Sequence, residues 1–351
     1  MKKAVVAIIG ITTIMIVVFA LVFLLPGQGL TVGYAALVQD NHAFVTDNDG
    51  VTILDISEPS RSRKVGRLAL ADGAFGVCLE NNLLYIAADE EGFAIADISD
   101  VTNPVTLGEY FTGGSAYEVA VEGSYAYVSV LNSGLQVLNI SNPESITKMG
   151  ELGNLGRGDD VEAHQGLVYF GDGSGGSSGL KIVDVSDPST PALIKSVQGT
   201  AGVFDIHIHG DLMFLACHSL GARILNISNP WSPTVISTYV KTGGEAYGVA
   251  GNNTHVYVAD LQKGAYLLDI TDPSNPSEIA SYSNAAPHGI FTDGEYIYLA
   301  DQDNGLIILD LDLSSVYDGY AAVPGFDSSF IPIGLVSLLV ISKRRIRKPK
   351  R

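Results

Sequence analysis

The sequence predicts an all-β fold, a seven-bladed β-propeller, between two ends that meet a membrane. A unit of about 42 residues recurs seven times along the chain. The 39 glycines and 14 prolines among 351 residues favour short strands joined by tight turns. Each end of the chain combines an apolar run with basic residues. A chain of this length can bury a large core.

The N-terminal segment, residues 1–29, is expected to be a signal anchor or a signal peptide. Residues 4–25 form an uncharged apolar stretch behind two lysines. As a transmembrane helix this stretch is long enough to cross roughly 30 Å of hydrocarbon. Its length favours retention over cleavage, while the small residues Gly27 and Gly29 would permit cleavage.

Residues 30–313 contain the repeat, in which a glycine is followed by an apolar run and then Asp or Asn. The repeat glycines are Gly50, Gly92, Gly134, Gly179, Gly221, Gly264 and Gly305. Each unit has four strand-like pieces, which in the third copy are residues 117–121, 126–130, 135–140 and 146–152. A four-stranded unit of this period is typical of a propeller blade.

The register is supported by a second pattern. Eight residues before the aromatic residue of each second strand stands a small or branched apolar residue. These anchor residues are Ala36, Val77, Val119, Val161, Ile206, Val249 and Ile290. The fourth strand, in contrast, is clear only six times. We expect residues 314–322 to supply the outer strand of the seventh blade, or that blade to keep three strands, with the ring closed by packing between the first and seventh blades. Residues 314–329 are therefore a linker or a closing strand.

One copy of the third strand, residues 180–188, reads Leu-Lys-Ile-Val-Asp-Val-Ser-Asp-Pro. It resembles the LVIVD-repeat family, whose repeats are taken to form propellers on bacterial and archaeal surface proteins. The resemblance covers residues 32–313. It implies the fold and a location at the cell surface, and it implies no reaction.

The C-terminal segment, residues 330–351, is an apolar run at 330–341 followed by a basic tail. Together with the preceding Val323-Pro324-Gly325-Phe326, it resembles archaeal sorting signals that begin Pro-Gly-Phe and are processed by archaeosortase-type enzymes. A short anchor assisted by snorkelling basic side chains is the competing interpretation. Because positive charge stays in the cytoplasm, the basic ends place the propeller on the extracellular side of the cell membrane.

Charge and cysteine content limit the partners. Residues 4–342 carry 11 basic and 38 acidic residues, a net charge of −27, which repels phosphate backbones and excludes nucleic acid as a partner. Cys78 and Cys217 lie on strands of different blades, so we expect two small buried thiols without a disulfide.

The start of each first strand is the candidate site, because it should line the central channel. The residues just before the anchors are Ala35, Gly76, Glu118, Asp160, Asp205, Gly248 and Gly289. One position earlier stand Tyr34, Phe75, Tyr117, Asp159, Phe204, Tyr247 and His288. Both sets break the symmetry of the repeat, as a site requires. We predict a ligand site formed by Glu118, Asp160, Asp205, Tyr117, Phe204, Tyr247 and His288. Such carboxylates and rings suit a cation, a sugar or a peptide, and a solvated channel mouth is the alternative.

Two further patterns in the sequence are candidates for metal sites. The acid-rich hairpins between second and third strands are residues 47–50, 89–92 and 301–305. They are ordinary turns or calcium loops, without a complete EF-hand pattern. His207 and His209, with Glu162 or Asp205, would suit zinc. The Asp or Asn that ends each third strand recurs in every blade, which indicates a turn-forming role.

The sequence has no Gly-x-Ser-x-Gly elbow, no phosphate-binding loop and no His-Glu-x-x-His motif. We therefore expect a binding or scaffolding module for protein, peptide or polysaccharide, with no cofactor. The alternatives are a lyase or hydrolase with its site around Glu118, Asp160 and Asp205, or a structural component of the cell envelope. A perturbed carboxyl in a deep pocket would favour the enzyme, and a flat face with exposed aromatics would favour the binder.

Overall fold

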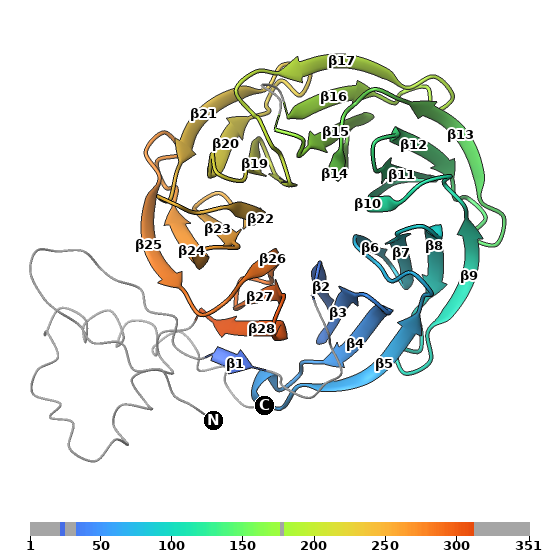
Figure 1. Ribbon diagram of the computed structural model, residues 1–351, viewed down its shortest axis with the longest axis horizontal. Coiled ribbons are helices and arrows are strands. Elements are labelled where there is room, and N and C mark those ends of the chain that lie inside the picture. The colour runs from blue at the N-terminus through green and yellow to red at the C-terminus, as the bar shows by residue number, and fades with distance from the viewer. Residues whose placement is uncertain (1–21, 25–32, 176–178, 312–351) are drawn as a thin grey trace, which may run out of the picture.

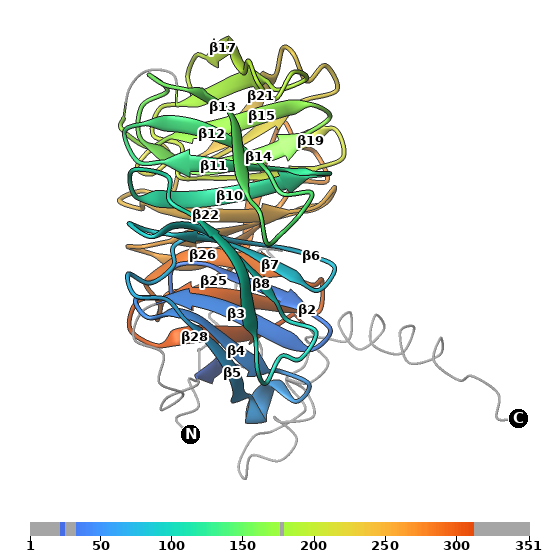
Figure 2. The same ribbon diagram turned by 90° about the vertical axis from the view of Figure 1, so that its right-hand side faces the viewer.

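A computed structural model describes residues 22–24, 33–175 and 179–311. In this part of the chain, 28 strands form seven four-stranded sheets around a central axis (Figure 1). Seen from the side, the strands run from one face of the disc to the other (Figure 2). The predicted all-β seven-bladed propeller is confirmed.

Each blade is an antiparallel meander whose first strand lines the axis. Blade 1 contains β2 Ala36–Gln39, β3 His42–Asp47, β4 Gly50–Asp55 and β5 Arg63–Ala69, and blade 2 contains β6 Val77–Glu80, β7 Leu83–Ala88, β8 Gly92–Asp97 and β9 Val105–Tyr110. Blade 3 contains β10 Ala116–Glu122, β11 Tyr125–Val130, β12 Gly134–Asn139 and β13 Thr147–Leu152, and blade 4 contains β14 Gly158–His164, β15 Leu167–Asp172, β16 Leu180–Asp184 and β17 Ala192–Val197. Blade 5 contains β18 Asp205–His209, β19 Leu212–Ala216, β20 Ala222–Asn226 and β21 Thr234–Tyr239, and blade 6 contains β22 Ala246–Gly251, β23 His255–Asp260, β24 Gly264–Asp269 and β25 Ser277–Tyr282. Blade 7 contains β26 Pro287–Thr292, β27 Tyr296–Asp301, β28 Gly305–Asp310 and β1 Val22–Leu24. The four strands of blade 3 agree with the predicted pieces to within one residue at each end.

The core lies between blades. The structure has seven clusters of buried apolar residues, and each cluster joins the facing sides of two neighbouring blades. At the junction of blades 7 and 1, Tyr298 and Ile308 pack with Val45 and Leu54. The predicted packing between the first and seventh blades is therefore confirmed. Because each sheet buries both faces against its neighbours, the second and third strands are almost wholly apolar.

The Asp or Asn at the end of each third strand forms a turn, as predicted. In six blades its side-chain oxygen accepts the backbone N–H two residues later, at 2.7–3.1 Å. The acceptors are Asp55, Asp97, Asn139, Asp184, Asn226 and Asp269. The corresponding partner of Asp310 is residue 312, which lies outside the described residues.

The outer strand of blade 7 corrects the sequence prediction. It is β1, which pairs antiparallel with β28 through Val22 to Leu309, Phe23 to Ile308 and Leu24 to Ile307. Neither residues 314–322 nor a three-stranded blade was the right expectation. The repeat search missed β1 because its three residues lie inside the apolar stretch that reads as a membrane helix. For these three residues the helix prediction was wrong, because the unpaired edge of β28 offers backbone partners.

The remaining predictions about the chain ends lie outside the described residues. They concern residues 1–21 of the anchor, the Pro-Gly-Phe motif, the apolar run 330–341 and the basic tail. Within residues 22–24, 33–175 and 179–311, we find no helix long and apolar enough to cross a membrane.

The pairing of β1 can be tested in the full-length chain. A Val22→Gly/Phe23→Pro/Leu24→Gly variant should lose the strand, because glycine and proline both disfavour it. Losing about three backbone hydrogen bonds at about 1 kcal/mol each should lower the melting temperature by roughly 5 °C. Differential scanning calorimetry measures the shift.

The matched control is Gln28→Pro, which places the same Gly-Pro-Gly tripeptide just after β1 and should leave the melting temperature unchanged. Equal shifts in the two variants would show that β1 does not stabilise the ring.

Candidate functional site

In four of the seven blades, a β-bulge at the start of the first strand accompanies the side chain that lines the channel at that point. In blade 3 the pairing of β10 with β11 shifts between Ala116 and Glu118, so the extra residue is Tyr117. The same shift occurs in blades 4, 6 and 7, where the extra residues are Asp159, Tyr247 and His288. Bulges re-aim side chains in this way near functional sites.

These side chains form a ring at one mouth of the channel, which we call the collar. Its members are Tyr34, Phe75, Tyr117, Phe204, Tyr247 and His288, together with the Arg157–Asp159 ion pair. Ring centroids are 4.5 Å apart for Phe75 and Tyr117, 4.6 Å for Phe204 and Tyr247, and 6.1 Å for Tyr34 and His288. Neighbouring rings at these spacings attract one another. All four predicted aromatic site residues therefore lie in one continuous ring.

Arg157 and Asp159 close the collar in blade 4, where the aromatic residue is missing. The Arg157 guanidinium lies 5.3 Å from the ring centre of Phe204, a cation–π contact. Its Nε donates to the Asp159 carboxylate at 2.8 Å, and the Gly173 N–H donates to the same carboxylate at 2.9 Å. The ion pair thus fills the gap between Tyr117 and Phe204.

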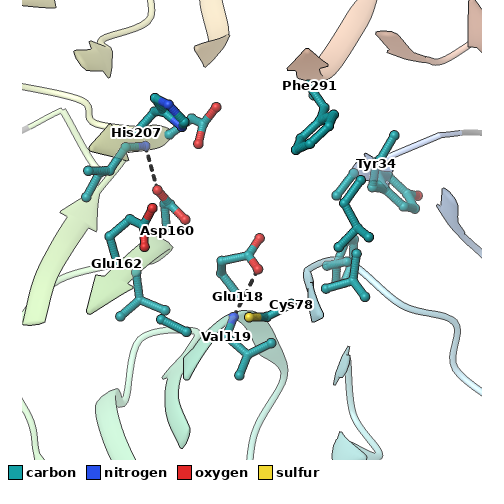
Figure 3. A pocket seen from close by; sticks show the side chains of 18 of the residues that line it. Tyr34, Cys78, Glu118, Val119, Asp160, Glu162, His207 and Phe291 are labelled. Atoms are coloured by element: carbon teal, nitrogen blue, oxygen red, sulfur yellow. Dashed lines mark hydrogen bonds between the residues drawn. The ribbon is translucent and has the colours of Figure 1, made fainter. Parts of the chain in front are cut away.

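Three carboxyl groups, those of Glu118, Asp160 and Asp205, line the channel next to the collar residues, and Figure 3 shows Glu118 and Asp160 among them. Asp160 accepts the backbone N–H of Ile206 in blade 5 at 2.5 Å. Asp205 accepts the N–H of Val249 in blade 6 at 2.6 Å. Glu118 accepts the N–H of Val119 at 3.0 Å and is also hydrogen-bonded to the backbone of Val77 in blade 2. The three predicted acids are therefore adjacent, and each bonds to the first strand of a neighbouring blade.

Close approach of the backbones explains the glycines elsewhere in this layer. A Cβ at Gly248 would lie 2.8 Å from the His288 carbonyl oxygen, and one at Gly289 would lie 2.8 Å from the Tyr34 carbonyl oxygen. At Gly76 a Cβ would collide with the Glu118 carboxylate, which occupies that space. Blade 6 lies too close to blade 7, and blade 7 too close to blade 1, for a side chain at Gly248 or Gly289, whereas blades 3 to 5 carry the acids at this position.

The channel is a cavity of about 640 Å³ whose wall includes the collar, the acids and the residues beyond them. Apolar groups of Leu37, Ala120 and Phe291 line it, together with Glu162 and His207. The His207 Nε2 atom lies 3.0 Å from the Gly251 carbonyl oxygen. Among the described residues, the Glu162 carboxyl has one hydrogen-bond donor, the N–H of Ala163 beside it.

Burial in this cavity raises the pKa values of four carboxyl groups, those of Glu118, Asp160, Glu162 and Asp205. It raises the pKa of Glu162 to about 8, with the Asp160 charge as a second cause. It raises the pKa of Asp160 to about 7. The pKa values of Glu118 and Asp205 lie well above the usual range, because of burial and then the neighbouring Asp160 charge. Burial also lowers the pKa of His207 and His288, so both imidazoles favour the neutral form.

The metal-site hypotheses find no support in the arrangement. In the part of the chain that the structure describes, no group of three or more His, Cys, Asp or Glu side chains is placed to hold a metal ion. His209 is exposed and does not join His207 in a site with Glu162 or Asp205. In the hairpins proposed for calcium, Asp47 binds Arg67, and Asp301 accepts backbone N–H groups of its own turn.

The two cysteines are free thiols, as predicted. Cys217 is buried between blades 4 and 5. Cys78 is half-buried rather than buried, because it lines the cavity at the edge of the core cluster between blades 2 and 3. Burial raises its pKa to about 12, which keeps the thiol protonated and unreactive.

Sequence reasoning missed three features of the site. Arg157 stands outside the aligned positions, so no repeat comparison selects it. Glu162 was considered only as a zinc ligand, although its position one residue after the anchor Val161 is a signal that it reaches the channel. The hydrogen bonds between neighbouring first strands depend on how closely the blades approach one another around the ring, and residue spacing along the sequence does not give that distance.

The fold and the channel define a seven-bladed propeller with an aromatic-lined mouth. Residues 36–68, 73–112, 113–152, 156–199, 202–241, 243–284 and 288–323 match the LVIVD repeat, so the chain belongs to the LVIVD repeat family. The resemblance drawn from the third strands is thereby confirmed. No curated protein matches the chain.

Solved structures share the fold at low sequence identity. The propeller domain of Cps50 (Swd1) from Myceliophteria thermophila is 11% identical, with a TM-score of 0.65, covering 79% of this chain and 95% of that one. The WD40 propeller domain of Doa1 is 12% identical, with a TM-score of 0.65, covering 87% and 99%. The extracellular domain of the putative hybrid two component system BT3049 from B. thetaiotaomicron is 15% identical, with a TM-score of 0.61, covering 84% of this chain and 42% of that one. These similarities show the fold alone. Propeller repeat domains generally serve as binding or scaffold modules.

The buried acids should make the protein less stable as pH rises. Their folded-state pKa values lie above the unfolded values of about 4, so between about pH 4 and pH 8 the unfolded chain has released protons that the folded chain retains. The free energy of unfolding therefore falls through this window. Glu162→Gln cannot ionise, so its melting temperature should fall less between pH 5 and pH 8. Parallel slopes for variant and parent in calorimetry would contradict this assignment.

The bond from Asp205 to blade 6 predicts a contrast between two substitutions. Asp205→Asn keeps an oxygen for the Val249 N–H and removes an ionisable group, so stability at pH 7 should stay equal or rise. Asp205→Ala leaves that N–H without its acceptor, which should cost about 1–3 kcal/mol. Chemical denaturation measures both free energies, and equal stabilities would rule out a bridging role for the carboxyl.

Proposed function

We propose that this chain is a membrane-tethered binding module that holds a protein, peptide or polysaccharide at the collar on the extracellular side of the cell. The observation that carries the proposal is the closed aromatic collar at one mouth of a rigid ring. Aromatic rings present large, stiff surfaces that stack on sugars and pack against peptide side chains. The membrane location and the extracellular side rest on the sequence of the two ends.

The direction of the chain supports a collar that faces away from the tether. The hairpins between second and third strands surround the collar, since Tyr34 Oη donates to Asn48 at 2.7 Å and Gln302 contacts His288 at 3.1 Å. Strand β28 starts in such a hairpin and ends on the opposite face. Val22 pairs with Leu309 near that end, so the described chain enters and leaves on the face opposite the collar.

The hydrogen bonds that Asp160 and Asp205 accept favour binding over catalysis. The carboxyls of Asp160 and Asp205 are engaged with backbone N–H groups of the next blade. No hydroxyl, thiol or imidazole of the described cavity forms the hydrogen-bonded pair with a base that activates a nucleophile. A collar above such a layer binds a ligand without needing these acids to react.

An enzyme is the second candidate, and Glu162 is the observation that favours it. Its carboxyl combines a pKa of about 8, a cavity position and little hydrogen bonding, features that suit a general base or acid. Proton transfer by a lyase would then be centred on Glu162 rather than on Asp160 or Asp205.

The binding proposal is tested by thermal melting of the full-length chain in detergent against a panel of glycans and peptides. A ligand at about 100 times its Kd adds about 2.7 kcal/mol of stability, a shift of several degrees. A Phe204→Ala/Tyr247→Ala variant should weaken binding by at least tenfold, because it opens the collar.

The control is Trp231→Ala, which removes a half-exposed aromatic side chain of the outer rim and should leave binding intact. Loss of binding in the rim variant alone would move the ligand site to the outer strands and refute the collar.

A further inference from the structure

We propose that the channel behind the collar binds an organic ammonium ion, supplied by a polyamine or by a lysine side chain of a peptide. This inference rests on the proposed function and names the ligand chemistry of the same site. Three features support it: the carboxyl groups that line the cavity, one carboxyl without a side-chain partner, and the aromatic collar at the mouth.

The part of the cavity wall that the structure describes is rich in carboxyl groups. It contains five carboxyl groups, those of Glu118, Asp159, Asp160, Glu162 and Asp205. Its one guanidinium, that of Arg157, is committed to Asp159 and to the face of Phe204. The cavity therefore holds four carboxyls that face no cation of the described chain. Burial raises their pKa values, and a positively charged ligand would favour their ionised form, so such a ligand is their electrostatic complement.

Glu162 provides an independent sign of a missing partner. Its side chain points into the cavity beside Asp160 (Figure 3), and the hydrogen bond from Ala163 is the one described donor to its carboxyl. Unlike Asp160 and Asp205, it holds no neighbouring blade. A buried carboxyl of this kind is costly unless a donor reaches it, and an ammonium group brings three donors and a charge.

The ligand is an organic cation rather than a metal ion. No three ligating side chains of the described residues converge on one point, as a metal would require. The acids are instead spread around the channel: Glu118, Asp160 and Asp205 adjoin the collar positions, and Glu162 stands level with the apolar groups of Leu37, Ala120 and Phe291. A chain of methylene groups ending in ammonium matches this order, with cation–π contacts at the collar and hydrogen bonds at the acids.

The experiment compares 1,6-diaminohexane with the neutral 1,6-hexanediol, which has the same chain length. Isothermal titration calorimetry is performed on the full-length chain in detergent at pH 8, with sodium chloride at matched ionic strength. We expect binding of the diamine and none of the diol. Spermidine and a lysine-containing peptide, each with an acetylated form as control, then distinguish the two sources of ammonium.

Glu162→Gln should weaken diamine binding at least tenfold while the melting temperature without ligand stays equal or rises. The matched control Glu144→Gln removes an exposed acid outside the cavity and should bind as the parent does. Equal binding of diol and diamine, or equal losses in the two variants, would overturn the ammonium assignment. If a neutral glycan still binds and is lost in the Phe204→Ala/Tyr247→Ala variant, the binding module stands and the ammonium inference alone falls.

Discussion

The structure depends on one constraint, which is that no blade can bury its own sheet. Each four-stranded sheet has two apolar faces, and both are covered only when a neighbour stands on each side. Seven junctions, each with its own cluster of buried side chains, satisfy every sheet once the ring is closed. The junction of blades 7 and 1 has its own buried cluster like the other six, and that cluster contains the fewest buried residues. It differs in that the two blades come from opposite ends of the repeat array.

Closure also decides what the axis can hold. Where the first strands of blades 6 and 7 approach the next strand, a Cβ at Gly248 or Gly289 would meet a backbone carbonyl oxygen, so only glycine fits at these two positions. Across blades 3 to 5 there is room for side chains, and these are carboxyls that bond to the neighbouring backbone. A buried acid is expensive, and the hydrogen bonds from adjacent blades recover part of its cost. The channel wall therefore combines glycines at the close approaches in blades 6 and 7 with an acidic layer across blades 3 to 5.

Much of this could be predicted from the sequence, because the repeat is strict. The period and register of the repeat predicted the seven blades. The positions two residues before the anchor residues predicted the channel residues Tyr117, Phe204, Tyr247 and His288. What escaped prediction lies where symmetry is broken or where distant segments meet. The pairing of β1 with β28 joins the two ends of the propeller, and no local pattern in three apolar residues reveals it. The role of Glu162 depends on distances across the channel rather than on spacing along the chain.

The pairing of β1 has a consequence for how the protein is made. Its first described strand is synthesised first and its partner β28 is synthesised last, so the ring stays open until nearly the whole chain exists. At about 5–20 residues per second, this interval is roughly 15 s to 1 min. Throughout it, β1 and the apolar face of blade 1 that packs against blade 7 lack their partners, and an exposed strand edge is prone to wrong pairing. A nascent chain of this design therefore needs protection of these surfaces until synthesis is nearly complete, since the last strand that the structure describes is the one that closes the ring.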